Sequence, residues 1–251
     1  MSTPLPDGVT DADFRSLIED KYDGSTENRH LLRRDIARLA AGEPLAYVIG
    51  WIPFLGLKIH LDSKPLIPRP ETEWWTEELA AHLAGKDDVA ILDLCAGSGA
   101  IGCALLKLHP AATVSFGEIN PEHEATIAKN LAENNLKDAE IHIGDLFAPF
   151  AGNTFDIIAT NPPYIPHGRT LEHSVTGFEP AEALFAGEDG LAVIRRIAAE
   201  APAHIRHGGE LWLECDITNA EEAKALVGAY AKRATLRTDQ YGRPRLVVGY
   251  Y

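Results

Sequence analysis

The fold is decided by the stretch Val89-Ala-Ile-Leu-Asp-Leu94-Cys-Ala-Gly-Ser-Gly99-Ala-Ile-Gly102. An apolar strand pattern that ends at Leu94 leads into a short loop of small residues and then into a helical pattern. Small side chains let a ligand approach the backbone closely, and the N–H groups at the start of a helix point toward it. The stretch therefore predicts a strand, a ligand-binding loop and a helix, which together open an α/β fold.

Strand and helix patterns alternate from this stretch to the end of the chain. The predicted strands are 89–94, 113–119, 139–143, 155–160, 210–215, 234–238 and 245–249. The predicted helices are 100–108, 121–135, 190–205 and 219–232. This alternation is typical of a mostly parallel sheet with helices on both faces. Ligands bind beyond the carboxyl ends of such strands, so the functional residues are expected there.

Acidic residues stand at the ends of the next two predicted strands. Glu118 lies 25 residues beyond Asp93, where an acid accepts hydrogen bonds from the ribose hydroxyls of a nucleoside cofactor. Asp145 and Leu146 follow the third strand and suit the amine and the ring faces of adenine. Three consecutive strand ends thus predict a nucleoside-binding site.

The loop also indicates which cofactor binds. A dinucleotide fold requires G-x-G-x-x-G beside the pyrophosphate, but Cys95 occupies the place of the first glycine. The loop residues are Cys95, Ala96, Gly97, Ser98 and Gly99. S-adenosylmethionine fits better, since it has no phosphates and presents an ammonium and a carboxylate, which Asp93 near the loop can help to hold.

The fourth predicted strand ends in Asn161-Pro162-Pro163-Tyr164. The two prolines fix φ and lack an N–H, which makes the turn stiff. The Asn161 side-chain oxygen and the Pro162 carbonyl then form a pair of fixed acceptors for a planar –NH2 group, and Tyr164 offers a ring to pack against it. This arrangement suits attack of the nitrogen on a sulfonium methyl, a reaction that depends on orientation and desolvation more than on a strong base.

Three regions are predicted along the chain. Residues 1–45 form a helical N-terminal domain, in which Thr10 caps a first helix. Residues 46–70 form a linker, with a hairpin made from strands at 47–50 and 54–59 and a proline-rich segment after it. Residues 71–251 form the catalytic domain.

The composition restricts the partners. The 251 residues carry 23 Lys and Arg against 37 Asp and Glu, a formal net charge of −14. Such a charge argues against sequence-independent binding to DNA or RNA, which needs cations to displace counterions from phosphates, and against anionic membrane surfaces. A basic protein partner is compatible with it.

Location and metal content follow from what the sequence lacks. No apolar run approaches the roughly 18 residues that a membrane helix requires, and the N-terminus has prolines and early acids in place of a signal peptide. Cys95, Cys103 and Cys215 are odd in number and include no C-x-x-C pair. This pattern is typical of reduced thiols, so we expect a cytoplasmic protein without a metal site.

Taken together, these motifs resemble the HemK/PrmC family of S-adenosylmethionine-dependent methyltransferases over nearly the whole chain. The most specific blocks are Leu66-Ile-Pro-Arg-Pro-Glu-Thr-Glu73, Glu179-Pro-x-x-Ala-Leu184 and Gly187-Glu-Asp-Gly-Leu191. Asn-Pro-Pro-Tyr alone is shared with enzymes that methylate nucleic acid amines. Cys95 stands in place of the family's usual first glycine, and Glu118 in place of its commoner aspartate.

The resemblance implies an activity, a fold and a partner. The activity is methylation of the side-chain amide nitrogen of the glutamine in the Gly-Gly-Gln motif of class I peptide chain release factors. The fold is the Rossmann-like class I methyltransferase sheet of seven strands, the last antiparallel. By this analogy the 95–99 loop holds the cofactor, Glu118 its ribose, Asp145 and Leu146 its adenine, and 161–164 the glutamine. The N-terminal domain helps to dock the release factor; we expect a monomer that does not bind nucleic acid directly.

Three alternatives stay open. A paralogous activity would methylate a glutamine of a ribosomal protein. A nucleic acid methyltransferase would use the same Asn-Pro-Pro-Tyr clamp on an adenine amine, although the net charge of −14 argues against it. A methyltransferase-like module would bind a partner without catalysis, although the loop, the acids and the clamp are all present.

Overall fold

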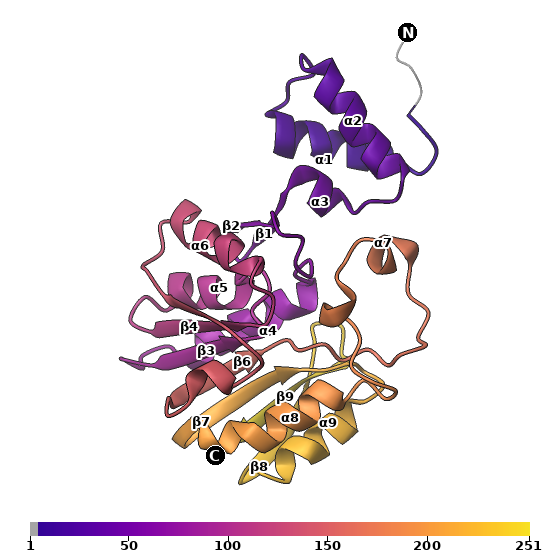
Figure 1. Ribbon diagram of the computed structural model, residues 1–251. Helices are drawn as coiled ribbons and strands as arrows, with labels where there is room; N and C mark the ends of the chain where they lie inside the picture. Colours follow the sequence, from indigo (N-terminus) through magenta and orange to yellow (C-terminus); the bar gives the residue numbers. More distant parts are fainter. Residues whose placement is uncertain (1–4) are drawn as a thin grey trace.

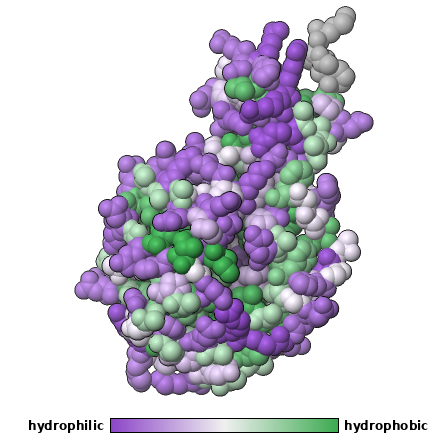
Figure 2. All heavy atoms as spheres, viewed as in Figure 1, coloured by the Kyte–Doolittle hydropathy of each residue, from purple (hydrophilic) through white to green (hydrophobic). Residues whose placement is uncertain are grey.

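A computed structural model describes residues 5–251 and shows a layered α/β domain with a smaller helical unit above it (Figure 1). Residues 1–4, part of the terminus that we expect to carry no signal peptide, lie outside the described residues. The helical unit consists of α1 (Asp11–Tyr22), α2 (Arg29–Ala40) and α3 (Leu45–Ile49). The antiparallel strands β1 (Trp51–Phe54) and β2 (Leu57–His60) join it to the larger domain. Figure 2 shows that hydrophilic residues cover most of the visible surface of the helical unit.

Helix α1 begins at a capping box. The Thr10 backbone N–H donates to the Asp13 carboxylate at 3.0 Å, and the Asp13 N–H donates to Thr10 Oγ1 at 3.1 Å. This exchange satisfies two backbone donors that the start of a helix otherwise leaves free. Leu17 is fully buried on the inner face. The prediction of a first helix capped by Thr10 is confirmed.

The prediction of a strand at 47–50 is wrong, because Leu45–Ile49 form helix α3. Pro44 precedes the first turn with a φ of −54°, and Gly50 ends the helix in the left-handed conformation at a φ of 98°. Tyr47 and Val48 are both buried. A short apolar run fits a buried helical turn as well as a strand, so the local pattern did not distinguish them.

The hairpin turns inside the segment 54–59, which was predicted as a single strand. Leu55 and Gly56 have φ values of 47° and 71°, and positive φ at both central residues is the geometry of a tight two-residue hairpin turn. Phe54 and Leu57 pair on either side of it. A hairpin is therefore present, but its strands are Trp51–Phe54 and Leu57–His60.

The larger domain is built on a seven-stranded sheet with the order β5-β4-β3-β6-β7-β9-β8. Its strands are β3 (Ala90–Leu94), β4 (Thr113–Glu118), β5 (Glu140–Ile143), β6 (Phe155–Thr160), β7 (Ile205–Glu214), β8 (Arg233–Thr238) and β9 (Pro244–Tyr250). Neighbours are parallel, except that β9 runs antiparallel to β7 and β8. The chain moves outward from β3 to β5 and returns through β6 on the other side of β3, so the strand order reverses there. The predicted α/β class and the antiparallel last strand are confirmed.

Helices cover both faces of the sheet (Figure 1). One face carries α4 (Pro70–His82), α5 (Ala100–Leu108) and α6 (His123–Glu133). The other carries α8 (Ala192–Glu200) and α9 (Ala220–Gly228). Short helical turns in the connections are η1 (Ala148–Phe150), α7 (His173–Thr176), η2 (Ala181–Ala183) and η3 (Ala201–Ala203).

Four helices of the larger domain differ from the predictions; one is α9, which was predicted to end at 232 and ends at Gly228. Helix α4 was not predicted, although Pro70 in its first turn is a favourable start. Helix α6 starts at His123 rather than at 121, since Asn120 Oδ1 accepts a hydrogen bond from the Glu122 N–H at 3.0 Å and forms a turn first. Helix α8 ends at Glu200, well before the predicted 205, where strand β7 already begins.

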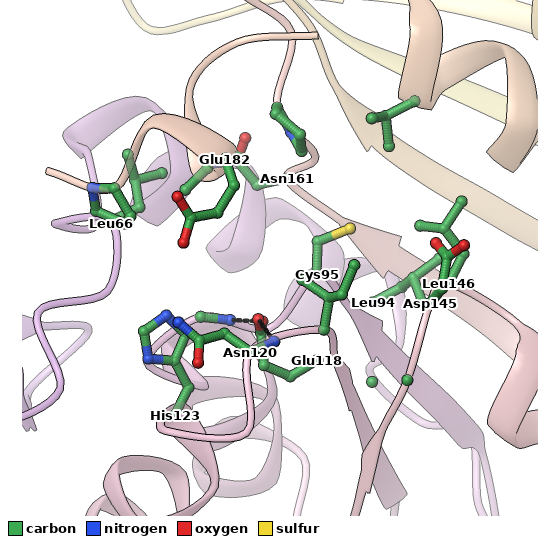
Figure 3. Close-up of a pocket in the computed structure, with 18 of the residues that line it drawn as sticks. Leu66, Leu94, Cys95, Glu118, Asn120, His123, Asp145, Leu146, Asn161 and Glu182 are labelled. Atoms are coloured by element: carbon green, nitrogen blue, oxygen red, sulfur yellow. Dashed lines mark hydrogen bonds between the residues drawn. The ribbon is translucent and has the colours of Figure 1, made fainter. Parts of the chain in front are cut away.

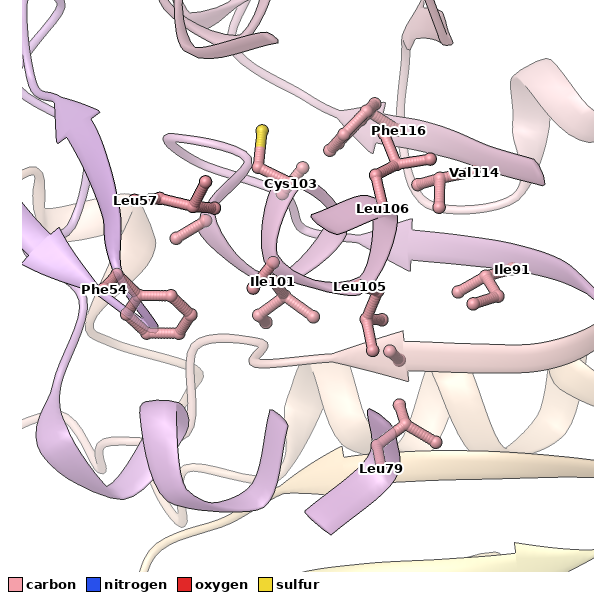
Figure 4. Packing of buried hydrophobic residues seen from close by; sticks show 14 of the residues in the cluster. Phe54, Leu57, Leu79, Ile91, Ile101, Cys103, Leu105, Leu106, Val114 and Phe116 are labelled. Atoms are coloured by element: carbon pink, nitrogen blue, oxygen red, sulfur yellow. The ribbon is translucent and has the colours of Figure 1, made fainter. Parts of the chain in front are cut away.

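An apolar cluster surrounds α5, which lies between the hairpin and the sheet (Figure 4). Phe54 and Leu57 of the hairpin belong to this cluster, as does Phe116 of β4. Gly102 permits the close packing, because a Cβ there would lie 2.3 Å from the Phe116 ring. The tight contact between α5 and the sheet positions the loop that precedes α5 at the carboxyl ends of the strands.

Candidate active site

A cavity of about 200 Å³ opens at the carboxyl ends of β3, β4, β5 and β6 (Figure 3). This is the place at which the strand order reverses and at which α/β sheets bind their ligands. Its wall contains seven of the residues predicted from sequence, namely Cys95, Gly97, Glu118, Asp145, Leu146, Asn161 and Pro163. Residues from four separate segments thus meet in one cavity, because each segment follows the carboxyl end of a parallel strand.

The loop between β3 and α5 has an unusual backbone conformation. Cys95, Gly97 and Gly99 have φ values of 61°, 55° and 74°, in the left-handed region that favours glycine. Cys95 carries a side chain there, at a cost of about 1 kcal/mol. Burial raises the pKa of its thiol to about 12, so the thiol stays neutral near pH 7. The conformation explains why a glycine is favoured at this place and shows that cysteine adopts the same turn.

Glu118 ties this loop to the end of β4. Its Oε2 accepts a hydrogen bond from the Gly97 N–H at 2.7 Å, and its Oε1 accepts one from the Asn120 N–H at 2.9 Å. The residue is almost fully buried and lies in the cavity wall. Each carboxylate oxygen can accept more than one hydrogen bond, so both oxygens can also accept from donors inside the cavity. A pair of adjacent hydroxyl groups matches that capacity.

Four of the residues predicted to bind the cofactor do not reach this cavity wall, namely Asp93, Ala96, Ser98 and Gly99. Asp93 is fully buried beneath the loop, where its Oδ2 accepts a hydrogen bond from the Gly102 N–H at 2.8 Å. Burial raises the pKa of this carboxyl well above its ordinary value. Through Oδ2, Asp93 therefore fastens the strand end to the start of α5, while its Oδ1 is buried without a hydrogen-bond partner in the described residues.

The far side of the cavity is formed by Asp145 and Leu146 (Figure 3). The Asp145 carboxylate pairs with both terminal nitrogens of Arg196 in α8, at 3.0 and 2.9 Å. Ile119 is 60% exposed although it is a large apolar residue, and it also lines the cavity. An acid and two apolar side chains thus surround this end, a combination that suits a flat ring with an exocyclic amine.

Sequence reasoning missed several residues of the wall. Leu66 comes from the linker, Glu182 from η2 and His123 from the start of α6. The His123 ring lies 2.8 Å from the Ser63 hydroxyl, and burial lowers the pKa of the imidazole. Leu66 and Glu182 lie far from these strand ends in sequence. His123 follows the end of β4 by five residues and had a local signal, the Asn-Pro helix start just before it.

Asn161 lies between the first cavity and a second one. The second cavity measures about 160 Å³ and is lined by Pro162 and Tyr164 as well as by apolar side chains that include Leu171 and Val175. Asn161 belongs to both walls, and its Oδ1 is buried without a hydrogen-bond partner in the described part of the chain. A buried unsatisfied acceptor at the junction of two cavities is suited to a donor that a ligand brings.

Two of the most specific sequence blocks contact each other at this junction. The buried Glu179 carboxylate accepts a hydrogen bond from the Ile67 N–H at 3.0 Å and pairs with Arg69. The Tyr47 hydroxyl donates to the Pro65 carbonyl at 2.6 Å. These bonds hold Leu66, which lines both cavities, against the sheet. The linker is therefore part of the site as well as a connection between units.

The described residues contain no cluster of three or more His, Cys, Asp or Glu side chains arranged to hold a metal ion. Within the same residues, no helix is long and apolar enough to cross a membrane.

The site offers one cavity for a nucleoside-like ligand and a second for a planar amide or amine, with the Asn161 acceptor between them. It can hold a nitrogen beside an electrophile on the first ligand.

Comparison with known proteins gives relatives for most of the chain. Residues 73–178 match the methyltransferase small domain. The release factor glutamine methyltransferase of Lactococcus lactis is 35% identical over 86% of this chain and 81% of its own length. The protein of the same name from Streptococcus pneumoniae is 34% identical over 97% of this chain and 83% of its own length.

Solved structures agree in fold. A methyltransferase from Pyrococcus furiosus matches with a TM-score of 0.58 and 16% identity, over 90% of this chain and 98% of its own. The Thermus thermophilus 16S rRNA N2 G1207 methyltransferase matches with a TM-score of 0.58 and 20% identity, over 80% of this chain and 49% of its own. At such low identity these likenesses concern the fold alone.

Proposed function

Because the chain belongs to the release factor glutamine methyltransferase family, we propose that it methylates the side-chain amide nitrogen of the glutamine in the Gly-Gly-Gln motif of class I peptide chain release factors. The methyl donor in this proposal is S-adenosylmethionine. The observation that carries the proposal is the unpartnered Asn161 Oδ1 between the two cavities. A primary amide in the second cavity supplies the N–H donor that this oxygen lacks.

The residues that line the first cavity match the chemistry of the cofactor. Glu118 has free acceptor capacity for two ribose hydroxyls, and Asp145 with Leu146 suits the adenine amine and ring. The loop from Cys95 to Gly99 lies beside the expected place of the methionine part. Arg196 is the only Lys or Arg among the residues of this wall and already pairs with Asp145, which fits a cofactor without phosphates. When bound, the cofactor supplies an electrophilic methyl group on a sulfonium.

The residues of the clamp orient and desolvate the substrate nitrogen. Asn161 Oδ1 and the Pro162 carbonyl accept the two N–H groups of the glutamine amide, and this leaves its lone pair directed toward the first cavity. The bound cofactor would supply the methyl carbon to this nitrogen, the electron pair of the broken carbon–sulfur bond would stay on sulfur, and one N–H proton would then pass to water. Fixed acceptors favour the positive charge that develops on nitrogen and need no reorganisation during the reaction.

The partner and its docking site belong to the same proposal. We expect the helical N-terminal unit to help dock the release factor, and its hydrophilic surface suits a polar contact (Figure 2). The net charge of −14 favours a basic protein surface over nucleic acid. Since the proposed substrate acts in translation termination, we expect the enzyme in the cytoplasm. We also expect it to be a monomer.

A methylation assay tests the assignment. The purified protein with labelled S-adenosylmethionine is expected to label a class I release factor that carries Gly-Gly-Gln and not its Gly-Gly-Ala variant. Labelling of a ribosomal protein, rRNA or DNA in place of the release factor would contradict the proposal and would favour one of the alternative substrates.

A further inference from the structure

We propose that Thr72 and Glu214 are positioning residues, which hold the Asn161 amide with its oxygen toward the substrate. The inference rests on the proposed function, because it concerns the clamp that would hold the glutamine. Neither residue is part of the Asn-Pro-Pro-Tyr motif. Thr72 lies in α4 and Glu214 is the last residue of β7.

Glu214 reaches the clamp through the register of the sheet. Strands β6 and β7 are parallel, and Thr160 pairs with Leu213, so Asn161 and Glu214 leave the sheet side by side. The Glu214 side chain is almost fully buried. Burial of a carboxylate costs free energy unless hydrogen-bond donors surround it, so donors are expected around Glu214.

Three side chains donate to this carboxylate, two from helix α4 and one from the segment that follows β6. The Thr72 hydroxyl and the Trp75 indole N–H both reach Oε2 at 2.7 Å, and the Tyr164 hydroxyl reaches Oε1 at 2.9 Å. Tyr164 is the last residue of the clamp. One buried carboxylate therefore holds the end of the clamp directly and its beginning through Thr72.

The direction of these hydrogen bonds determines the orientation of the Asn161 amide. The Trp75 indole can only donate, so Oε2 of Glu214 must accept. The Thr72 hydroxyl has a single hydrogen and gives it to Glu214, so it can only accept from Asn161, whose Nδ2 lies 3.2 Å away. With Nδ2 held in this way, Oδ1 faces away from Thr72, and it is the atom that has no partner.

The opposite orientation would disable the clamp. If the amide rotated by half a turn, Nδ2 would face the substrate –NH2 group, and two donors would oppose each other. Without the Thr72 hydroxyl, nothing else among the described contacts of the Asn161 side chain selects the productive orientation. Thr72 and Glu214 thus act on the reaction through Asn161 and without contacting the substrate.

The test compares three variants of the full-length protein with wild type. Thr72→Val has nearly the same shape but no hydroxyl; Thr72→Ser retains the hydroxyl. Thr76→Val is the matched control, because the Thr76 hydroxyl is also buried in α4 but donates to the Thr72 backbone carbonyl at 2.7 Å and does not reach Asn161. With labelled cofactor and release factor, we expect Thr72→Val to lower kcat about 100-fold, the scale for loss of one preorganised polar group. Cofactor affinity should be retained.

Rescue and control separate positioning from packing. Thr72→Ser should recover most of the kcat lost in Thr72→Val, and Thr76→Val should affect the melting temperature more than kcat. Equal kcat for Thr72→Val and wild type would overturn the inference. So would equal losses in Thr72→Val and Thr76→Val, which would indicate a structural effect of removing any buried hydroxyl.

A spectroscopic measurement tests the inference without relying on turnover. The side-chain amide signal of Asn161, identified by its loss in Asn161→Ala, should exchange slowly with solvent in wild type and Thr72→Ser and rapidly in Thr72→Val. The same exchange rate in all three proteins would refute the proposed chain of hydrogen bonds from Asn161 through Thr72 to Glu214, here called the relay. An inactive wild type with the expected exchange pattern would instead contradict the proposed substrate and leave the relay supported.

Discussion

Asn161 is the residue on which the proposed chemistry depends most directly. Its oxygen is buried, unpartnered and shared by both cavities. We expect Asn161→Ala to lower the rate of methyl transfer by about 100- to 1000-fold, because a preorganised acceptor is lost from the reacting centre. Cofactor affinity should stay close to that of wild type, since Glu118 and the loop are untouched. Single-turnover kinetics and calorimetric titration with the cofactor measure the two effects.

Near-full activity of Asn161→Ala would contradict the clamp mechanism. A combined loss of cofactor binding and activity would mean that Asn161 belongs chiefly to the first cavity. The variant thus distinguishes between the two walls to which this residue contributes.

Sequence reasoning at the residue scale succeeded where chemistry follows directly from a strand end. Glu118 ends β4 and Asn161 directly follows β6, the two strands on either side of β3, and both residues lie in the cavity wall. It was less successful for Asp93, which lies inside a strand with its side chain buried beneath the loop. Strand alternation sends successive side chains to opposite faces, but it does not tell whether an acid meets a ligand or a backbone N–H.

The packing of α5 against the sheet depends on a glycine that has an ordinary helical backbone. We expect Gly102→Ala to destabilise the fold by about 1–3 kcal/mol, because the new Cβ would lie 2.3 Å from the Phe116 ring and overpack the core (Figure 4). This effect exceeds the gain of up to about 1 kcal/mol that alanine normally brings to a helix. Urea unfolding measures the difference.

Gly228→Ala in α9 provides the matched control. Its Cβ would meet Ala234 Cβ at 3.6 Å, an ordinary contact, so this variant should be neutral or slightly stabilised. Equal stability changes in the two variants would show that helix propensity, and not the contact with Phe116, decides the effect at Gly102.

The connection between the helical unit and the linker should be sensitive to acid. Glu43 pairs with Arg38 at 2.8 Å and with Lys64 at 3.0 Å, and chiefly the Arg38 hydrogen bonds lower the pKa of its carboxyl to about 2. A carboxyl whose pKa is lower in the folded state stabilises the fold above its ordinary pKa of 4.5. We therefore expect this stabilisation to be lost as the pH falls from 4.5 toward 2.

Thermal unfolding as a function of pH checks this expectation. Glu43→Gln should lower the melting temperature near neutral pH and flatten its dependence on pH in the acid range. Glu27→Gln is the control, because Glu27 is an exposed carboxylate of the same unit. If the wild type and Glu43→Gln lost stability in parallel on acidification, the ion pairs would not be the cause.

At the element scale, short segments were harder to predict than long ones. The parallel strands and α5 have longer apolar patterns, and each was predicted close to its observed position. Helix α3 ends at Gly50 and the hairpin turns at Leu55 and Gly56, and all three residues have positive φ values. A few apolar residues in a row do not determine a period, so tertiary packing decided between helix and strand.

The charge of the whole molecule should affect association rather than chemistry. With a net charge of −14, docking of a basic release factor surface should weaken as salt shortens the range of electrostatic attraction. Between about 0.05 and 0.5 M salt we expect KM for the release factor to rise several-fold while kcat changes little. Steady-state kinetics at several salt concentrations measures both parameters. A KM that does not respond to salt would exclude electrostatic docking.

The sequence by itself determined the fold class and the glycine-containing loop, and it located the acid at the end of β4 and the Asn-Pro-Pro-Tyr segment after β6. Each depends on a local pattern: apolar strands, positive φ positions, and polar residues at strand ends that a parallel sheet brings to one edge.

Only the tertiary structure decided how these parts cooperate. Thr72 and Glu214 are separated by 142 positions and meet at the clamp because β7 lies beside β6 in a defined register and α4 packs across their ends. Glu179 and Ile67, both outside the sheet, also meet across 112 positions of sequence. Hydrogen bonds over such sequence separations depend on strand order and packing, which no local periodicity encodes.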